Sequence, residues 1–135
     1  MSVRRWAFAG MLAAAATATT VAMALPASAS TVDERTEYAA IAGHIEVVRD
    51  ATTWDFVVSK LRGDTCVYAK VTVEVVNFPG HEYRSTKICA SDPWRSVAFP
   101  GRAVHSFTRV ARVDLCKEVP FRPDLCQRVW SEPAR

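Results

Sequence analysis

Between Thr31 and Trp130, hydrophobic residues alternate with polar ones in short runs, and many of the hydrophobic residues are β-branched. A period of two is typical of strands that bury one face, whereas an amphipathic helix requires apolar positions three and four residues apart. The strand pattern occupies seven segments: 44–49, 53–60, 66–76, 82–90, 95–99, 103–116 and 126–130. Together they predict an all-β fold, a small antiparallel β-sandwich of six to seven strands.

One segment favours a different structure. Acidic residues begin the stretch from Asp33 to Ile41, the apolar group 38–41 ends it, and Gly43 follows in the position of a helix C-cap. This order predicts a short helix over residues 33–41.

Arg62-Gly63 separates the second and third strand segments and predicts a tight hairpin, because Gly readily adopts positive φ. The even loop length sets the register of the two strands. The expected opposite pairs are Trp54 with Val71, Phe56 with Ala69, and Val58 with Val67.

Two further turns are expected where the same three residues recur. Phe78-Pro79-Gly80 and Phe99-Pro100-Gly101 each place Pro before Gly. Pro presets φ for the first central position of a type II turn, and Gly accepts the positive φ of the second. We therefore predict a chain reversal at both places.

The first 29 residues have the three parts of a secretory signal peptide. Arg4-Arg5 is the positive start, the uncharged Ala-rich stretch runs from Trp6 to Leu25, and Ala27-Ser28-Ala29 is the cleavage pattern. We predict a segment over 1–29 that is helical in the full-length chain, then a single secreted, extracellular domain over 30–135. A membrane anchor is the weaker interpretation, because the stretch is mostly Ala and Thr and no basic cluster follows it. No membrane span is expected in the mature form.

Removal of this segment changes the charge of the protein. The whole chain has 17 Lys and Arg against 14 Asp and Glu, but two of the arginines and none of the acidic residues lie in 1–29. The predicted mature domain therefore has a net charge of only +1. Because nucleic-acid binding requires clustered basic residues, no nucleic-acid partner is expected.

All four cysteines lie in the predicted mature domain, and an even number in an exported chain indicates two disulfides. We favour Cys66–Cys89 and Cys116–Cys126 among the three pairings, because each closes a short loop. A tight hairpin at 78–80 would place Cys66 about 13 Å from the residue opposite Cys89, which is too far for a bridge. The first pairing therefore requires a wide, bulged loop or a link between two sheets.

The segment between Cys116 and Cys126 is the main candidate contact loop, since a disulfide would join its ends and two prolines would stiffen it. Rigid exposed loops lose little entropy on association, so Phe121 and Arg122 are candidate contacts. Protease inhibitors present their reactive bond on a rigid loop of the same kind. Phe121 is the better candidate for the P1 residue of such a loop, because with Arg122 at P1 the residue at P1′ would be Pro123. In the simpler interpretation, the loop only ties the last strand to the sheet.

Other candidates carry weaker signals. Aromatic residues could line a binding face (Tyr68, Tyr83, Trp94 and Trp130), and Trp94 is a candidate contact because it follows the turn at Asp92-Pro93. Arg62-Gly63-Asp64 spells an integrin-recognition tripeptide, but the match is only three residues long and a turn after a strand is a sufficient explanation for it. The three histidines have no metal-binding spacing, and no nucleophile or phosphate-loop motif occurs, so no catalytic residue, metal or cofactor is expected.

These observations predict a non-catalytic binding or interaction module. Its expected partner is an extracellular macromolecule or small ligand that the sequence does not identify. The second hypothesis is a protease inhibitor acting through the Cys116–Cys126 loop, and the third is a small extracellular enzyme.

Overall fold

The computed structural model describes residues 29–75, 78–105 and 108–132, and they form eight strands with no helix. The strands are β1 (Ala29–Arg35), β2 (Ala39–Val47), β3 (Ala51–Lys60), β4 (Val67–Val75), β5 (His81–Arg84), β6 (Ser96–Val104), β7 (Thr108–Lys117) and β8 (Leu125–Glu132). The predicted signal peptide lies outside the described residues except for Ala29, which begins β1.

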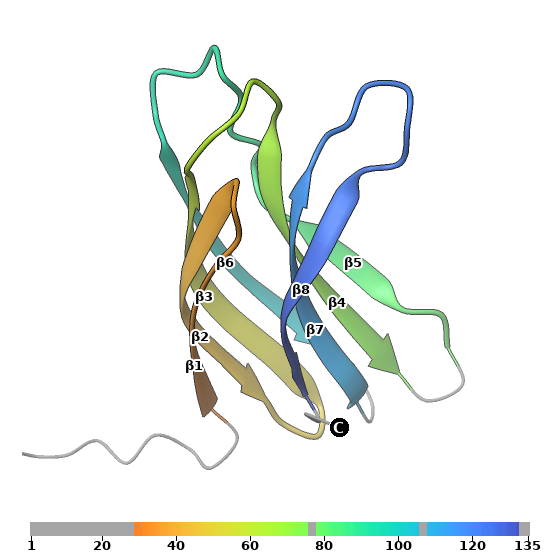
Figure 1. Ribbon diagram of the computed structural model, residues 1–135. Coiled ribbons are helices and arrows are strands. Elements are labelled where there is room, and N and C mark those ends of the chain that lie inside the picture. The colour runs from red at the N-terminus through yellow and green to blue at the C-terminus, as the bar shows by residue number, and fades with distance from the viewer. Residues whose placement is uncertain (1–28, 76–77, 106–107, 133–135) are drawn as a thin grey trace, which may run out of the picture.

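Two four-stranded antiparallel sheets build the domain. Their strand orders are β1-β2-β3-β6 and β5-β4-β7-β8. Figure 1 shows the two sheets facing each other as two layers. The predicted disulfide-stabilised β-sandwich is thus confirmed, with one strand more than the upper number expected.

The core lies between the sheets and is formed by alternate residues of the central strands. In β3 the inward side chains of Trp54, Phe56 and Val58 are at most 2% exposed, while Asp55 and Val57 between them face solvent. Alternation of this kind is what a sheet with one buried face requires. The fully buried core positions also include Ile41, Ile45, Val67, Ala69, Val71, Val113 and Leu115.

The helix predicted over 33–41 is wrong, because these residues form a hairpin between β1 and β2. The Thr36 backbone N–H donates to the Ala39 carbonyl oxygen (2.8 Å), and Ala39 N–H donates to Thr36 Oγ1 (3.1 Å). Ala39, Ile41 and Ile45 occupy buried positions at a period of two. This alternation continues to Ile45, beyond the segment predicted to be helical. It is the pattern of a strand that buries one face.

The tight hairpin predicted at Arg62-Gly63 is also wrong. Strands β3 and β4 belong to opposite sheets, so Trp54, Phe56 and Val58 do not pair with β4 but pack across the core from it. The apolar faces were assigned correctly, yet the connection crosses between layers. The Leu61 N–H donates to the Tyr38 carbonyl oxygen (2.8 Å), which keeps the start of this connection attached to the first sheet.

Of the two Phe-Pro-Gly sequences, Phe78–Gly80 lies in the connection between β4 and β5, but Phe99–Gly101 lies inside β6 and forms no turn. Strand β6 is at the edge of its sheet, where Pro100 lacks an N–H at little cost. Gly101 lies against Trp54, and a Cβ added to it would be 2.1 Å from Trp54 Cζ2. The Pro and Gly therefore allow edge pairing and close aromatic packing rather than a reversal.

Both predicted disulfides are present. The Cα atoms of Cys66 and Cys89 are 4.0 Å apart, and those of Cys116 and Cys126 are 4.1 Å apart. In the β4–β5 pairing Val73 lies opposite His81, and the bridge between Val67 and Ile88 extends the antiparallel pairing beyond β5 toward the two cysteines. Of the two geometries that the first pairing allowed, a link between the two sheets is excluded, because Cys66 and Cys89 lie next to the paired residues Val67 and Ile88 of one sheet.

Candidate functional site

Four connections gather at one end of the sandwich, which we call the loop end. They are residues 36–38, 61–66, 85–95 and 118–124, and Figure 1 shows them together at the top of the molecule. The β3–β4 connection lies between the β5–β6 and β7–β8 connections. The predicted contacts Phe121 and Arg122 lie on the β7–β8 loop, whereas Trp94 lies on the β5–β6 loop, on the other side of residues 61–66.

The tip of the β7–β8 loop is a tight turn that displays an aromatic side chain. The Arg122 N–H donates to the Val119 carbonyl oxygen (3.3 Å), so Pro120 and Phe121 are the two central residues. Pro at the first central position and positive φ at the second are the features of a type II turn. Phe121 has φ 61° and an exposed fraction of 107%. The turn therefore holds this ring entirely in solvent.

The backbone at Phe121 is strained. Among the described residues, positive φ occurs at Phe121, Gly43 and Gly63, and Phe121 is the one of these that is not a glycine. A residue with a Cβ in this left-handed region costs roughly 1–2 kcal/mol, and a bulky residue is rare there. Such strain persists where surrounding structure holds it, and it concentrates at functional sites.

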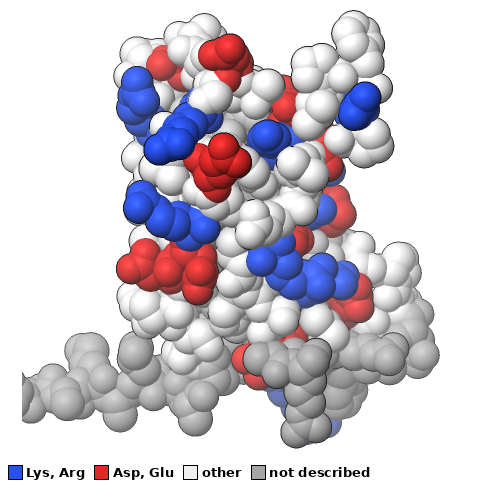
Figure 2. All heavy atoms as spheres, in the orientation of Figure 1, with Lys and Arg blue, Asp and Glu red and all other residues white. Residues whose placement is uncertain are grey.

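The base of the loop is held by contacts on both sides. The Cys116–Cys126 disulfide joins the adjacent strands, and Glu118 N–H donates to the Cys66 carbonyl oxygen (2.9 Å). Asp124 Oδ2 accepts a hydrogen bond of 2.5 Å from the Tyr68 hydroxyl. The loop therefore projects from a fixed base, and Figure 2 shows it standing apart from the neighbouring surface with a notch between them.

Tyr68 is an unexpected member of this base. It lies on the outer face of β4 and is still only 1% exposed. The Arg84 guanidinium carbon and the Lys87 ammonium nitrogen lie 5.4 and 5.7 Å from its ring centroid, within the range of cation–π contacts. Tyr68 alternates with the core residues Val67 and Ala69, and the residues that cover its ring on the outer face come from β5 and the segments beyond.

The buried Tyr68 hydroxyl makes stability sensitive to alkaline pH. Burial, reinforced by the hydrogen bond to Asp124, raises the pKa of Tyr68 to about 12. The unfolded chain loses this proton near pH 10 while the folded protein keeps it, so stability decreases as pH rises from about 10 to about 12. We expect the urea midpoint to fall more between about pH 9 and pH 11 in the wild type than in Tyr68→Phe. Equal pH slopes in urea titrations followed by circular dichroism would contradict this assignment.

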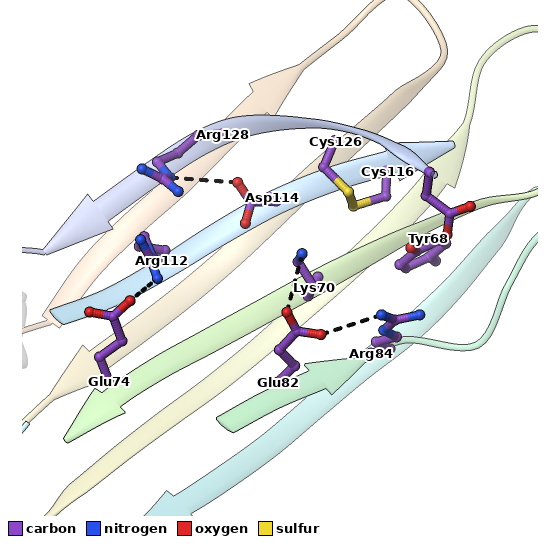
Figure 3. Close-up of polar contacts among 11 residues, drawn as sticks. Tyr68, Lys70, Glu74, Glu82, Arg84, Arg112, Asp114, Cys116, Cys126 and Arg128 are labelled. Carbon is purple, nitrogen blue, oxygen red and sulfur yellow. Dashed lines mark hydrogen bonds and ion pairs between the residues drawn. A yellow bond between two sulfur atoms is a disulfide. The ribbon is translucent and has the colours of Figure 1, made fainter. Parts of the chain in front are cut away.

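The outer face of the β5-β4-β7-β8 sheet carries a set of paired charges. Lys70 and Arg84 both contact Glu82 (3.5 and 3.3 Å), and Arg128 contacts Asp114 (3.6 Å). Arg112 pairs with Glu74 in the same layer, and Figure 3 shows these side chains on one face together with the Cys116–Cys126 disulfide. Such partly exposed pairs contribute about 0–1 kcal/mol each. Positive and negative charges here satisfy each other, and Figure 2 likewise shows both signs interspersed over the face in view.

Two hollows flank the β3–β4 loop. One has a volume of about 320 Å³, separates this loop from the β7–β8 loop, and is lined by Asp64, Thr65, Cys66, Glu118, Val119, Pro120 and Asp124. The other, of about 300 Å³, separates it from the β5–β6 loop and is lined by Lys60, Leu61, Arg62, Gly63, Cys89, Ala90, Asp92, Trp94 and Arg95. We call the second hollow the Trp94 groove. Arg62 and Asp64 of the Arg-Gly-Asp sequence thus border different hollows.

Two of the other three candidate aromatics are partly buried, and the third is exposed. Tyr83 and Trp130 are partly buried against the core, whereas Trp94 is 44% exposed. Of the four candidate aromatics, Trp94 is the one with an exposed side chain.

The histidines and acidic residues that the structure describes form no metal-binding cluster. Within 29–75, 78–105 and 108–132, no group of three or more His, Cys, Asp or Glu residues is arranged to hold a metal ion. His44 lies 3.4 Å from Thr31 Oγ1, and His105 lies 3.0 Å from Thr52 Oγ1, where burial lowers the pKa of His105. The same ranges contain no helix of the length and hydropathy that a membrane crossing requires.

Neither a protein-family model nor a curated protein matches this sequence.

Proposed function

We propose that this protein is a non-catalytic extracellular binding module that docks on a macromolecular partner through its β7–β8 loop. The observation that carries the proposal is Phe121, a fully exposed aromatic ring at positive φ on the tip of a disulfide-joined loop. A ring in this position contributes nothing to the core, and its backbone makes the free protein less stable. Binding offers a physical reason for both features.

The energetics of association favour such a loop. Aromatic residues contribute much of the binding energy of protein interfaces, because a large rigid surface is buried with few rotatable bonds. The turn at Pro120, the disulfide and the bonds at Glu118 and Asp124 hold the loop in one conformation before it binds. Little conformational entropy then remains to be lost, so more of the contact energy contributes to affinity.

The extracellular part of the proposal rests on two observations. The two disulfides are consistent with an extracellular protein, because cytosolic thiols are kept reduced. The predicted signal peptide over 1–29 supports export of the domain that follows.

The conformation of Phe121 favours a binding loop over a protease inhibitor. Segments that add to a partner as a strand are extended, with φ near −120 to −140°. Phe121 has φ 61°, so the backbone at this residue is not extended. The tip of the loop is therefore better suited to insert a side chain into a pocket than to lie along a protease cleft.

Site-specific photo-crosslinking tests the proposal directly. A benzoyl-phenylalanine at position 121 is expected to yield a discrete adduct with an extracellular macromolecule, because this position would be buried in the complex. The matched control carries the same probe in place of Val104, which is 77% exposed and ends β6 far from the loop end. Absence of an adduct at position 121, or identical adducts at both positions, would contradict the proposal.

Substitutions of Phe121 separate binding from stability. Phe121→Ala is expected to weaken binding of the crosslinked partner at least tenfold, as measured by calorimetry, because it removes the aromatic contact. Phe121→Gly should weaken binding equally but raise the free energy of unfolding by about 1 kcal/mol, because Gly adopts positive φ without strain. Phe121→Tyr should retain most of the affinity. Micromolar inhibition of subtilisin, chymotrypsin or trypsin that Phe121→Ala abolishes would instead support the protease inhibitor.

A further inference from the structure

We infer that the Trp94 groove is a second binding site and that it takes a sugar unit bearing a carboxylate. Three cationic side chains and one indole line this groove, which lies on the opposite side of residues 61–66 from the hollow next to the β7–β8 loop. Its volume of about 300 Å³ is at the lower end of the range for small-ligand sites. The site is independent of the proposed role of Phe121 and is tested with different variants.

The cations of the groove have no negatively charged partner among the residues that the structure describes. Lys60, Arg62 and Arg95 make no ion pair with any carboxylate of the described residues. Lys60 is the most constrained of them, since it is only 9% exposed and its ammonium donates to the Thr65 carbonyl oxygen (2.8 Å). A neutral carbonyl oxygen satisfies one of its three N–H groups and leaves its charge uncompensated.

The charges on the outer sheet face are arranged differently. On the outer sheet face Lys70, Arg84, Arg112 and Arg128 each contact a carboxylate, and Lys87 contacts Glu118 at the base of the β7–β8 loop. Burying a charge is costly unless an opposite charge or several hydrogen bonds compensate it. The uncompensated positive charge of Lys60 beside two arginines therefore marks the groove as a place for an external anion.

The acidic residue of the groove does not cancel this charge. Asp92 lines it, but Asp92 Oδ2 accepts a 2.6 Å hydrogen bond from the Cys89 N–H, and Asp92 N–H donates to the Cys89 carbonyl oxygen (3.1 Å). These bonds fix the turn that precedes Trp94. Three cations and one carboxylate leave the groove with a formal charge of +2.

The side chains of the groove match the two parts of an acidic sugar. The planar guanidinium of Arg binds carboxylates through two parallel hydrogen bonds, so Arg62 and Arg95 suit this group. The exposed indole of Trp94 offers a flat apolar surface to the C–H face of a pyranose ring. The Cys66–Cys89 disulfide holds one wall of the groove in place before ligand arrives. An acidic extracellular polysaccharide presents the ring and the carboxylate on the same unit.

Titration with defined oligosaccharides tests the inference. Tetragalacturonate is expected to bind the purified protein in calorimetry and to shift the Trp94 indole N–H resonance in two-dimensional NMR. Its methyl-esterified form keeps the rings and removes the charges, and it should bind at least tenfold more weakly. Affinity for tetragalacturonate should fall as salt is raised from 50 to 500 mM, because charge attraction is screened.

Three single variants identify the residues involved. Arg62→Gln, Arg95→Gln and Trp94→Ala should each weaken tetragalacturonate binding at least tenfold. Arg102→Gln is the matched control, because Arg102 is an exposed arginine of β6 that lies seven residues, or roughly 23 Å, along the chain from Arg95. It should leave the affinity unchanged, and unchanged circular dichroism spectra would establish that all four variants fold.

Several outcomes would overturn the inference. They are no measurable binding of tetragalacturonate, equal binding of the methyl ester, or equal loss of affinity in Arg102→Gln. Equal affinity for tetraglutamate would overturn the assignment to a sugar, because the groove would then recognise carboxylates without regard to a ring. Phe121→Ala should leave tetragalacturonate binding intact, so failure of this inference and failure of the proposed docking loop are distinguishable.

Discussion

Loss of the Cys66–Cys89 disulfide, in a Cys66→Ala/Cys89→Ala variant, is expected to lower the free energy of unfolding by about 3 kcal/mol. The bridge joins residues 23 positions apart, so its removal gives the unfolded chain many more conformations. A loss of this size is a large part of the roughly 5–15 kcal/mol that stabilises a typical domain. Urea titration followed by tryptophan fluorescence measures the change.

The second disulfide provides the comparison. Cys116→Ala/Cys126→Ala should also lower stability by about 3 kcal/mol, because the closed loop is shorter but the entropy depends only weakly on its length. Only this variant should reduce binding through Phe121, whereas loss of Cys66–Cys89 should reduce binding in the Trp94 groove. Stability that is unchanged in both double variants would contradict the assigned role of the bridges.

The second large effect is expected for Gly43→Ala, which should lower the free energy of unfolding by about 3 kcal/mol or more. Gly43 has φ 146°, and a Cβ added there would lie 2.0 Å from the Asp55 carbonyl oxygen and 2.9 Å from Phe56 Cα. Both atoms belong to the backbone of the neighbouring strand β3, so no side-chain rotation relieves the clash. The pairing of β2 with β3 has to shift at the centre of its sheet.

Gly63→Ala is the matched control for this prediction. Gly63 also has positive φ, at 95°, but an added Cβ would meet no atom within 4 Å. Its substitution should therefore cost only the backbone strain, about 1 kcal/mol. Thermal unfolding of both variants measures the difference, and similar losses would show that close packing at Gly43 is unimportant.

The candidate site could be predicted from the sequence only where covalent constraints define it. The cysteines and prolines around Phe121 act along a short stretch of chain, so the loop was recognised before its geometry was known. The Trp94 groove was not recognised as a unit. Lys60 and Arg62 come from the β3–β4 region and Arg95 from a connection 33 residues after Arg62, and nothing in the sequence shows that these charges meet without a counter-charge.

By itself, the sequence indicated most of the positions in the core and favoured the cysteine pairing that is observed. Hydrophobic alternation assigned Trp54, Phe56 and Val58 to the core, because successive side chains of a strand point to opposite faces. The tertiary structure decided which strands are neighbours. An apolar face is buried equally well by a paired strand or by a sheet across the core, so a period of two does not distinguish these arrangements. Alternation therefore could not show that strands β3 and β4 face each other across the core. The connection between these strands borders both candidate sites.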